Sequence, residues 1–442
     1  MKHFYIWLLI LIKSTSTILQ AAPNNKEPDI ELYLSTLFAV TEVMVTDVAS
    51  PPAAARYYSY TTMASYLAWV KSNKSEPSDK LHDYLKSQGL ELNLEPPQGI
   101  SPSFVANYAL LETGLRMMPS GKLLLLKQEE LVKTFLKKRW ISKKFLADNI
   151  AFAKAVSEKV VGYASKDSFN KLSTLTRYTP FQGEGYWYPT PPAYMAAVEP
   201  EWRTLRTFFV DDIKEFSPPP PAPFDLTENS VFFKQLNEVY QVTGSLSEEQ
   251  KLIANFWDCN PFKVDFSGHM AIGLKKISPG GHWIGIAGIA CRNGEKTMGE
   301  TIFIHTLLSM GLHDAFVSCW KEKYESNRIR PETAINRHLD AKWKPLLQTP
   351  PFPEYTSGHS VVSKLSAVIL THFFGDDFGF VDTSEVYFGL PERSFTSFHQ
   401  AAEEAAISRL YGGIHFRDAI VHGSHQGEKI GQMILDKLAA HE

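Results

Sequence analysis

Apolar residues recur along this chain at the spacing of helix faces, and strictly alternating stretches are nearly absent. A spacing of three or four residues places side chains on one side of an α-helix, whereas strands need a period of two. The pattern predicts helices in the first half over residues 30–48, 64–85, 103–118, 124–135 and 144–164. In the second half it predicts helices over 231–241, 247–257, 298–324, 360–374, 398–411 and 425–440. The sequence therefore predicts an all-α protein.

A proline block separates the two sets of predicted helices. Residues 218–221 are all proline, and Pro223 follows just beyond. Such a run cannot be helical and is expected to form a stiff, extended connector. We therefore predict an N-terminal helical bundle over 28–217 that serves as a scaffold, a connector over 218–224, and a second helical bundle over 225–442.

The N-terminus is typical of a secretory signal peptide. Lys2 and His3 precede an apolar run over 4–12, and small or polar residues then lead to Ala21. This order predicts a signal peptide over 1–21 with cleavage near Ala21, and an uncleaved anchor is the alternative. We expect no later segment to be long and apolar enough to span a membrane. We expect a secreted or periplasmic protein with no membrane partner, and we favour a monomer.

The net charge limits the kinds of partner expected, and the cysteine content limits the disulfides expected. The 45 basic and 48 acidic residues give a formal net charge of −3, which provides no general attraction to nucleic acid or to anionic membranes. Cys259, Cys291 and Cys319 are odd in number and so cannot all pair within the chain, and their spacing matches no metal motif. We interpret them as buried thiols, with one disulfide left open.

Chemistry-bearing residues occur in three segments of the second half. In the first, Arg330 follows Lys323 by seven residues, which is nearly two helical turns and would place both cations on one helix face. Pro331 is expected to end that helix at Arg330. Because this stretch carries several further charges, a solvated helix face explains it as well.

The second segment is Thr356-Ser357-Gly358-His359, which precedes the apolar stripe of a predicted helix. Thr or Ser caps a helix start, where free backbone N–H groups form an oxyanion site and glycine permits close approach. His359 could exchange a proton with a bound anion. An ordinary capped helix is the simpler alternative.

The third segment contains Ser408-Arg409 and, six residues after Arg409, His415. Gly412 and Gly413 predict the end of the helix that carries Arg409, so His415 lies on the following bend. The alternative is a helix end with a packed histidine.

Taken together, the three segments supply the cations and N–H donors that a buried oxyanion requires. Arginine suits two of these positions because its fork binds such oxyanions bidentately.

These three segments resemble, in order, the motifs of the superfamily that contains the vanadium-dependent haloperoxidases and the type 2 acid phosphatases. The family motifs are Lys-x6-Arg-Pro, Pro-Ser-Gly-His and Ser-Arg-x5-His, and the likeness runs from about Leu226 to the C-terminus. The first half resembles the helical bundle that haloperoxidases add. The chain looks most like the exported bacterial haloperoxidases. Two packed helical bundles are therefore expected, with the active site in the C-terminal one.

The resemblance implies a role for each matching residue. His415 would bind vanadium axially, His359 would serve in acid–base catalysis, and the vanadate oxygens would be bound by the remaining motif residues, Lys323, Arg330, Ser357, Gly358 and Arg409. Vanadate would be the cofactor, and phosphate can occupy the same site. Hydrogen peroxide and halide would be the substrates, with a small organic acceptor left open.

This chain departs from the family pattern at two positions. Thr356 replaces the usual proline, and Ala419 stands where the family often has aspartate. The neighbouring Asp418 is therefore our candidate for the group that orients His415. His282 and His313 also attract attention as ligands, but we interpret both as core histidines.

Aromatic residues favour haloperoxidase over phosphatase. Trp320 and Phe352 match places where haloperoxidases line the halide pocket, and Phe262 is a third candidate. The large helical first half points the same way, although plain core packing also explains the aromatics. We expect iodide or bromide as the halide. An acid phosphatase that forms a phosphohistidine is the alternative, and a non-catalytic oxyanion-binding protein is the third hypothesis.

Overall fold

The computed structural model describes residues 30–73, 80–191, 193–267, 270–273 and 276–440. The predicted signal peptide and its cleavage near Ala21 lie outside these residues. In the first half, the helices are connected by loops and short 3₁₀ turns. They are α1 (Ile30–Thr46), α2 (Pro51–Ser72), α3 (Lys80–Ser87), α4 (Pro102–Met117), α5 (Leu124–Lys138) and α6 (Leu146–Ala164).

The second half is also mainly helical. Its helices are α7 (Val231–Gly244), α8 (Glu248–Phe256), α9 (Pro279–Asn293), α10 (Met298–Ser326), α11 (Pro331–His338), α12 (Gly358–Phe374), α13 (Phe398–Tyr411) and α14 (Arg417–Ala440). Two short antiparallel strand pairs interrupt them: β1 (Val264–Ser267) with β2 (Met270–Gly273), and β3 (Phe380–Asp382) with β4 (Arg393–Phe395). The all-α prediction is confirmed.

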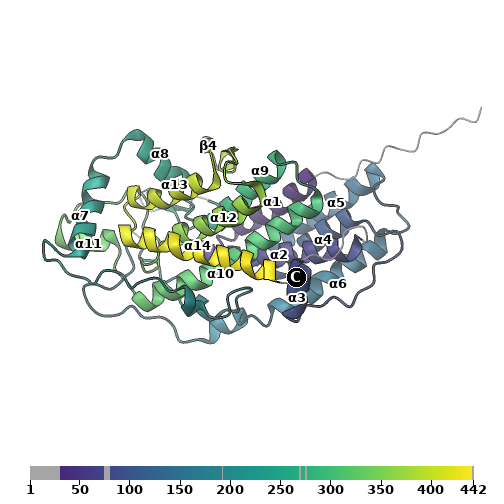
Figure 1. The fold of residues 1–442 in the computed structure, drawn as a ribbon, viewed down its shortest axis with the longest axis horizontal. Helices are drawn as coiled ribbons and strands as arrows, with labels where there is room; N and C mark the ends of the chain where they lie inside the picture. The colour runs from purple at the N-terminus through teal and green to yellow at the C-terminus, as the bar shows by residue number, and fades with distance from the viewer. Residues whose placement is uncertain (1–29, 74–79, 192, 268–269, 274–275, 441–442) are drawn as a thin grey trace, which may run out of the picture.

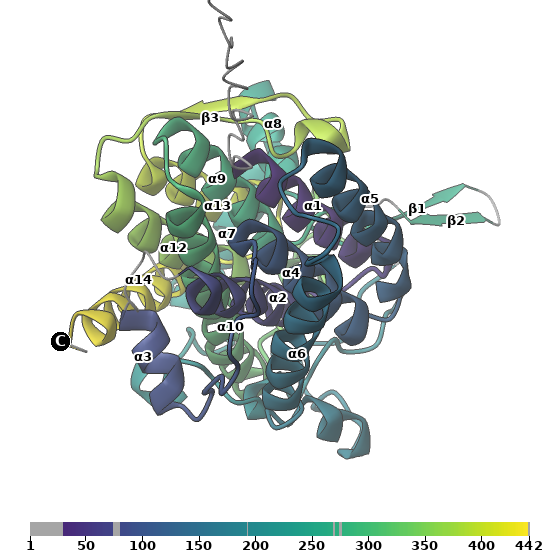
Figure 2. The same ribbon diagram turned by 90° about the vertical axis from the view of Figure 1, so that its right-hand side faces the viewer.

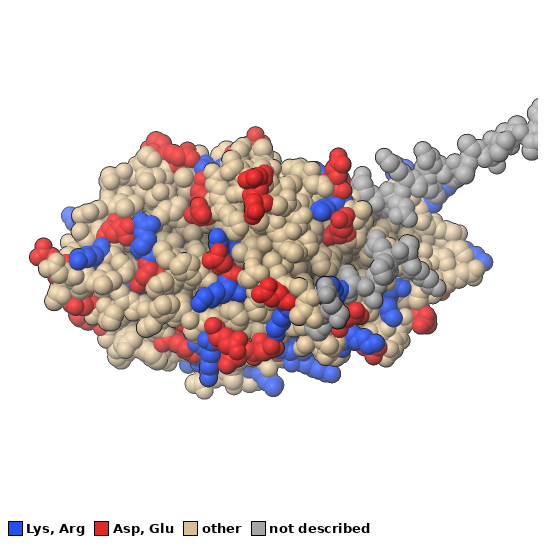
Figure 3. Space-filling model, in the orientation of Figure 1, with Lys and Arg blue, Asp and Glu red and all other residues tan. Residues whose placement is uncertain are grey.

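The helices form an elongated body. Helices α3 to α6 lie at one end and α7, α8 and α11 at the other, with α10, α12 and α14 running across the middle (Figure 1). In the turned view the β1–β2 hairpin projects from the side of the body (Figure 2). Basic and acidic side chains are interspersed over the face drawn in Figure 3, as the small net charge predicts.

Several helix predictions differ from the structure. Residues 64–85 were predicted as one helix, but α2 ends at Ser72 and α3 begins at Lys80. Helix α9 was not predicted, because it is buried on nearly every side and has no apolar stripe to detect. Helix α14 begins at Arg417, eight residues before the predicted start at residue 425. The eight-residue helix α11 was not predicted either, so the errors concern one buried helix, one short helix and several helix ends.

Helix α10 lies at the centre of the protein. By length and composition it could cross a membrane, so the prediction that no such segment exists is wrong on that criterion. However, 94% of its most apolar window is buried inside the protein, which identifies a core helix. One apolar core joins helices of both halves, and residues 217–226 between them form neither helix nor strand. The proposed domain boundaries themselves stay a prediction.

Glycines bring α14 against α12, the helix whose first turn contains the Ser-Gly-His motif. A Cβ added at Gly427 would stand 2.0 Å from the Val361 carbonyl oxygen, so the two backbones could not keep this contact. We expect Gly427→Ala to lower the free energy of unfolding by about 1–3 kcal/mol, because overpacking forces the helices apart. Chemical denaturation followed by circular dichroism would measure the change.

Gly162 in α6 provides a matched control, because it is exposed and nothing lies within 4 Å of an added Cβ. Gly162→Ala should leave stability unchanged or raise it by up to about 1 kcal/mol, the helix-propensity difference between the two residues. Equal stability of the Gly427→Ala and wild-type proteins would contradict the close helix contact.

Candidate active site

The structure brings the three sequence segments together at one end of the C-terminal helices. Lys323 lies near the end of α10, Ser357 caps α12, Arg409 lies in the last turn of α13, and His415 lies two residues before α14. One cavity is lined by Gly358, His359, Arg409 and His415. The predicted convergence of remote segments is therefore present in the fold.

Lys323 and Arg330 meet for a different reason from the one predicted. Helix α10 ends at Ser326, and Asn327 follows in the left-handed region with φ 47°. Arg330 is the residue that precedes α11, whose first residue is Pro331. The two cations therefore do not share a helix face, and the turn between α10 and α11 brings Arg330 to the site.

Backbone carbonyls hold both of these cations. Lys323 Nζ donates to the carbonyls of Pro353 and Glu354 at 3.2 and 3.1 Å and also to that of Thr356. Arg330 donates from Nε to the Phe352 carbonyl at 2.9 Å and from Nη1 to the Ile414 carbonyl at 2.8 Å. The segment before α12 thus forms a cradle that fixes the cations without neutralising their charge.

Arg409 lies in the last turn of α13 and lines the cavity. Its Nη2 donates to the Trp257 carbonyl at 2.7 Å and its Nε to the Ser408 hydroxyl at 2.9 Å. Burial lowers the pKa of Arg409 and of Arg330 to about 10 each, and that of Lys323 to about 7. The chain therefore buries three cationic side chains at a cost in free energy that a bound anion would offset.

Glu354, and not Asp418, orients His415. The Glu354 carboxylate accepts a hydrogen bond from His415 Nδ1 at 2.9 Å and a second from the Phe416 backbone N–H at 2.9 Å. Asp418 instead forms an ion pair with Arg328, which also contacts Glu354 at 3.3 Å. Asp418 thus acts on His415 only through two intervening side chains.

The second nitrogen of His415 faces the cations. With Nδ1–H donated to Glu354, Nε2 is left as an acceptor, and it lies 3.2 Å from Arg330 Nη1. Burial, together with the positive charges of Arg330 and Lys323, lowers the pKa of His415 well below its usual value. The imidazole is therefore neutral, as a metal-binding histidine must be.

The start of α12 supplies the remaining predicted residues. The Ser357 hydroxyl accepts a hydrogen bond from the Ser360 backbone N–H at 3.3 Å, so Ser357 is the cap of this helix. A Cβ added at Gly358 would lie 3.7 Å from the Trp320 ring, so the absence of a side chain keeps this corner of the cavity open. His359 Nε2 is buried without a hydrogen-bond partner. Burial and the nearby Arg409 lower the pKa of His359 well below its usual value.

Aromatic residues form one wall of the same cavity. The predicted halide-pocket residues Trp320, Phe352 and Phe262 all line it. The rings of Trp320 and Phe352 are 5.0 Å apart, and Lys323 Nζ lies 5.1 Å from the Phe352 ring centroid. A small anion beside this wall would be partly dehydrated while it stays close to positive charge.

The donor set fits vanadate. The site offers a neutral histidine nitrogen to the metal, buried cations for the oxygens, and an unpartnered His359 Nε2. Among the charged residues that the structure describes there, Glu354 is the only carboxylate bonded to His415, and its other oxygen is engaged with Arg328. Fold and site together define a helical enzyme that binds a tetrahedral oxyanion.

Comparisons with known proteins identify the family. The family model of the VCPO second helical-bundle domain matches residues 303–441. A crystal structure of a bacterial vanadium-dependent iodoperoxidase is 41% identical, covers 93% of this chain and 97% of its own, and superposes with a TM-score of 0.84. This chain belongs to the vanadium-dependent haloperoxidases, and vanadate is its cofactor.

More distant structures share the fold. A holo-type bacterial vanadium-dependent chloroperoxidase is 14% identical, covers 96% of this chain and 97% of its own, and has a TM-score of 0.64. Its apo-type counterpart, also 14% identical, covers 89% and 95% with a TM-score of 0.65. No curated protein sequence matched this chain.

Sequence reasoning missed Glu354 and the backbone carbonyl of Trp257. Glu354 is a lone acidic residue in a proline-rich, apolar stretch just before the Ser-Gly-His motif, which is the signal that could have revealed it. The Trp257 carbonyl could not be predicted, because a backbone group leaves no mark in the side-chain pattern. His313 is a core histidine as expected, with Nε2 bonded to the Arg206 carbonyl at 3.0 Å. The three cysteines are free and buried.

Proposed function

We propose that this haloperoxidase oxidises iodide with hydrogen peroxide at a vanadate bound to His415. The observation that carries the assignment of the site is His415 itself, whose Nδ1 is bonded to Glu354 while Nε2 faces buried cations. When bound, vanadate would supply Lewis-acid chemistry towards peroxide. Lys323, Arg330 and Arg409 would hold its oxygens and withdraw negative charge from them, together with Ser357 and Gly358 at the start of α12.

His359 has the geometry of a proton carrier. Its Nε2 has no partner in the protein, and its lowered pKa leaves it neutral and able to accept a proton from hydrogen peroxide. Once it has accepted this proton, the His359 imidazole can donate the proton to the oxygen that leaves together with the halide.

Two observations support iodide over chloride. The iodoperoxidase is the 41% identical structure, whereas the chloroperoxidases are 14% identical and support the fold alone. Iodide is also the halide that is easiest to oxidise, and it is the least strongly hydrated. A wall formed by Trp320, Phe352 and Phe262 dehydrates its anion, which costs least for iodide.

The protein loaded with orthovanadate should oxidise iodide in the presence of hydrogen peroxide and prefer it to bromide and chloride. A panel of the three halides and a simple phosphate ester, each with and without vanadate, tests this. Bromide or chloride turnover equal to iodide turnover would overturn the preference. Ester hydrolysis that vanadate inhibits, without halide oxidation, would support the phosphohistidine mechanism instead.

Secretion or export to the periplasm and the monomeric state stay predictions. The prediction of export rests on the sequence of residues 1–21, and the monomeric state is a prediction for measurement in solution. Size-exclusion chromatography with light scattering would measure the mass in solution against the 49.8 kDa of the chain.

A further inference from the structure

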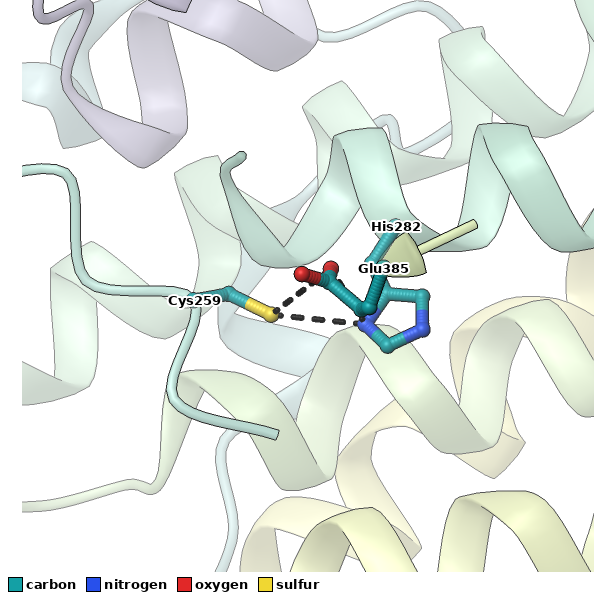
Figure 4. A group of neighbouring side chains, drawn as sticks. All are labelled: Cys259, His282 and Glu385. Atoms are coloured by element: carbon teal, nitrogen blue, oxygen red, sulfur yellow. Dashed lines mark hydrogen bonds and ion pairs between the residues drawn. The ribbon is translucent and has the colours of Figure 1, made fainter. Parts of the chain in front are cut away.

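A second cluster of ligand-type side chains adjoins the vanadate cavity, which one of its members, Cys259, also lines. It consists of Cys259, His282 and Glu385, which come from the loop after α8, from α9 and from the segment after β3 (Figure 4). All three are buried. None belongs to the motifs that define the vanadate site, and His282 had been interpreted as a core histidine.

The three ligand atoms face one another at distances that suit a metal. Cys259 Sγ lies 3.4 Å from His282 Nδ1, Nδ1 lies 3.2 Å from Glu385 Oε1, and Sγ lies 4.0 Å from the same oxygen. A point equally distant from these atoms is about 2.1 Å from each, close to Zn²⁺–ligand distances of about 2.0–2.3 Å. Thiolate, imidazole and carboxylate are together a zinc-type ligand set.

Asp382 fixes the orientation of His282. Its carboxylate lies 2.7 Å from His282 Nε2, and Ser384 donates to the other carboxylate oxygen from both its backbone N–H and its hydroxyl. With its proton on Nε2, the ring directs a bare Nδ1 at the thiol and at Glu385. Metal-binding histidines are held by this kind of carboxylate partner.

The competing interpretation is an imidazolium ion. Burial alone would lower the pKa of His282, but the carboxylates of Asp382 and Glu385 raise it well above its usual value. A proton on His282 Nδ1 could form a hydrogen bond to only one of its two neighbours, Cys259 and Glu385. The Cys259 thiol would keep only its long contacts. A divalent cation would bind all three atoms at once and would balance the buried carboxylates.

We propose that Cys259, His282 and Glu385 bind a zinc ion, with a solvent molecule as the fourth ligand. A zinc ion there would tie the loop after α8 to α9 and to the β3–β4 segment. His282 stacks on Trp257 with ring centroids 4.5 Å apart, and the Trp257 carbonyl binds Arg409. The zinc would thereby fix one wall of the vanadate site.

Metal analysis of the purified full-length protein tests the proposal directly. We expect one zinc per chain after dialysis, measured together with vanadium by mass spectrometry. Replacement of zinc by Co²⁺ should produce the visible bands of a four-coordinate ion and a near-ultraviolet thiolate-to-cobalt band. Absence of both bound zinc and these bands in the wild-type protein would overturn the proposal, whatever the variants show.

Matched variants locate the site. Cys259→Ser should remove the thiolate band, whereas Cys291→Ser, at another buried thiol on α9, should keep it. Asp382→Asn should weaken zinc binding by about 10- to 100-fold, because the partner of His282 loses its charge. His415→Ala should keep its zinc and lose vanadium, which separates the two sites. A thiolate band that survives Cys259→Ser would exclude this site, and circular dichroism would check that each variant folds.

Discussion

The His415→Ala protein is expected to lose vanadate, with an affinity reduced by more than about 100-fold relative to the wild type. This loss should exceed the roughly 10- to 100-fold typical of a residue that only supports a metal ligand. The variant removes the one nitrogen that Glu354 directs towards the cations, and that nitrogen is the group that would bind the metal. Equilibrium dialysis followed by vanadium analysis would measure the affinity.

Two further variants calibrate this result. Glu354→Gln keeps a group of similar shape beside His415 but loses its charge, and we expect vanadate affinity to fall by about 10- to 100-fold. His425→Ala removes an exposed histidine of α14 and should bind vanadate like the wild type. If His415→Ala retained tight vanadate binding and normal folding, the assignment of His415 as the vanadium ligand would be wrong.

Helical periodicity predicted most of the fold because most helices expose one face. The ends of α13 at Phe398 and Tyr411 agree with the prediction, since Gly413 follows with φ 73° and ends the helix. Helix α9 was not detected, because a helix buried all round shows no contrast between its faces. Burial on all sides does not by itself prevent detection, however, because the equally buried α10 was predicted over 298–324.

The site could be predicted from its charged motifs but not from their supports. The three motifs predict Lys323, Arg330 and Arg409 as one group. The reason given for the first two, a shared helix face, was wrong. The partner of His415 depends on how the segment before α12 folds back onto the start of α14. No local pattern encodes that distance in space, so Glu354 emerged only from the structure.

The cluster at Cys259 illustrates the same limit. Its residues are separated by 23 and 103 positions in the sequence, so no spacing rule for metal sites applies to them. Their proximity depends on α9 and on the β3–β4 segment, neither of which the periodicity predicted. A site assembled from distant residues that belong to no recognisable motif becomes visible only when the tertiary contacts are known.

Replacement of His359 should separate binding from turnover. We expect His359→Ala to retain most of its vanadate affinity, because the metal ligand and the three cations stay in place. Turnover with iodide should fall by about 10²- to 10⁴-fold, the usual contribution of a positioned acid–base group. Steady-state kinetics on fully vanadate-loaded protein, with vanadium content measured in parallel, would give both quantities.

The pattern of loss distinguishes catalysis from positioning. An acid–base group acts in the reaction itself, so kcat should fall while the vanadium content stays near that of the wild type. A residue that only shapes the cavity would instead weaken vanadate binding, and added vanadate would restore turnover. Full turnover in loaded His359→Ala protein would remove His359 from the mechanism. Its unpartnered Nε2, the reason for the assignment, would then need another explanation.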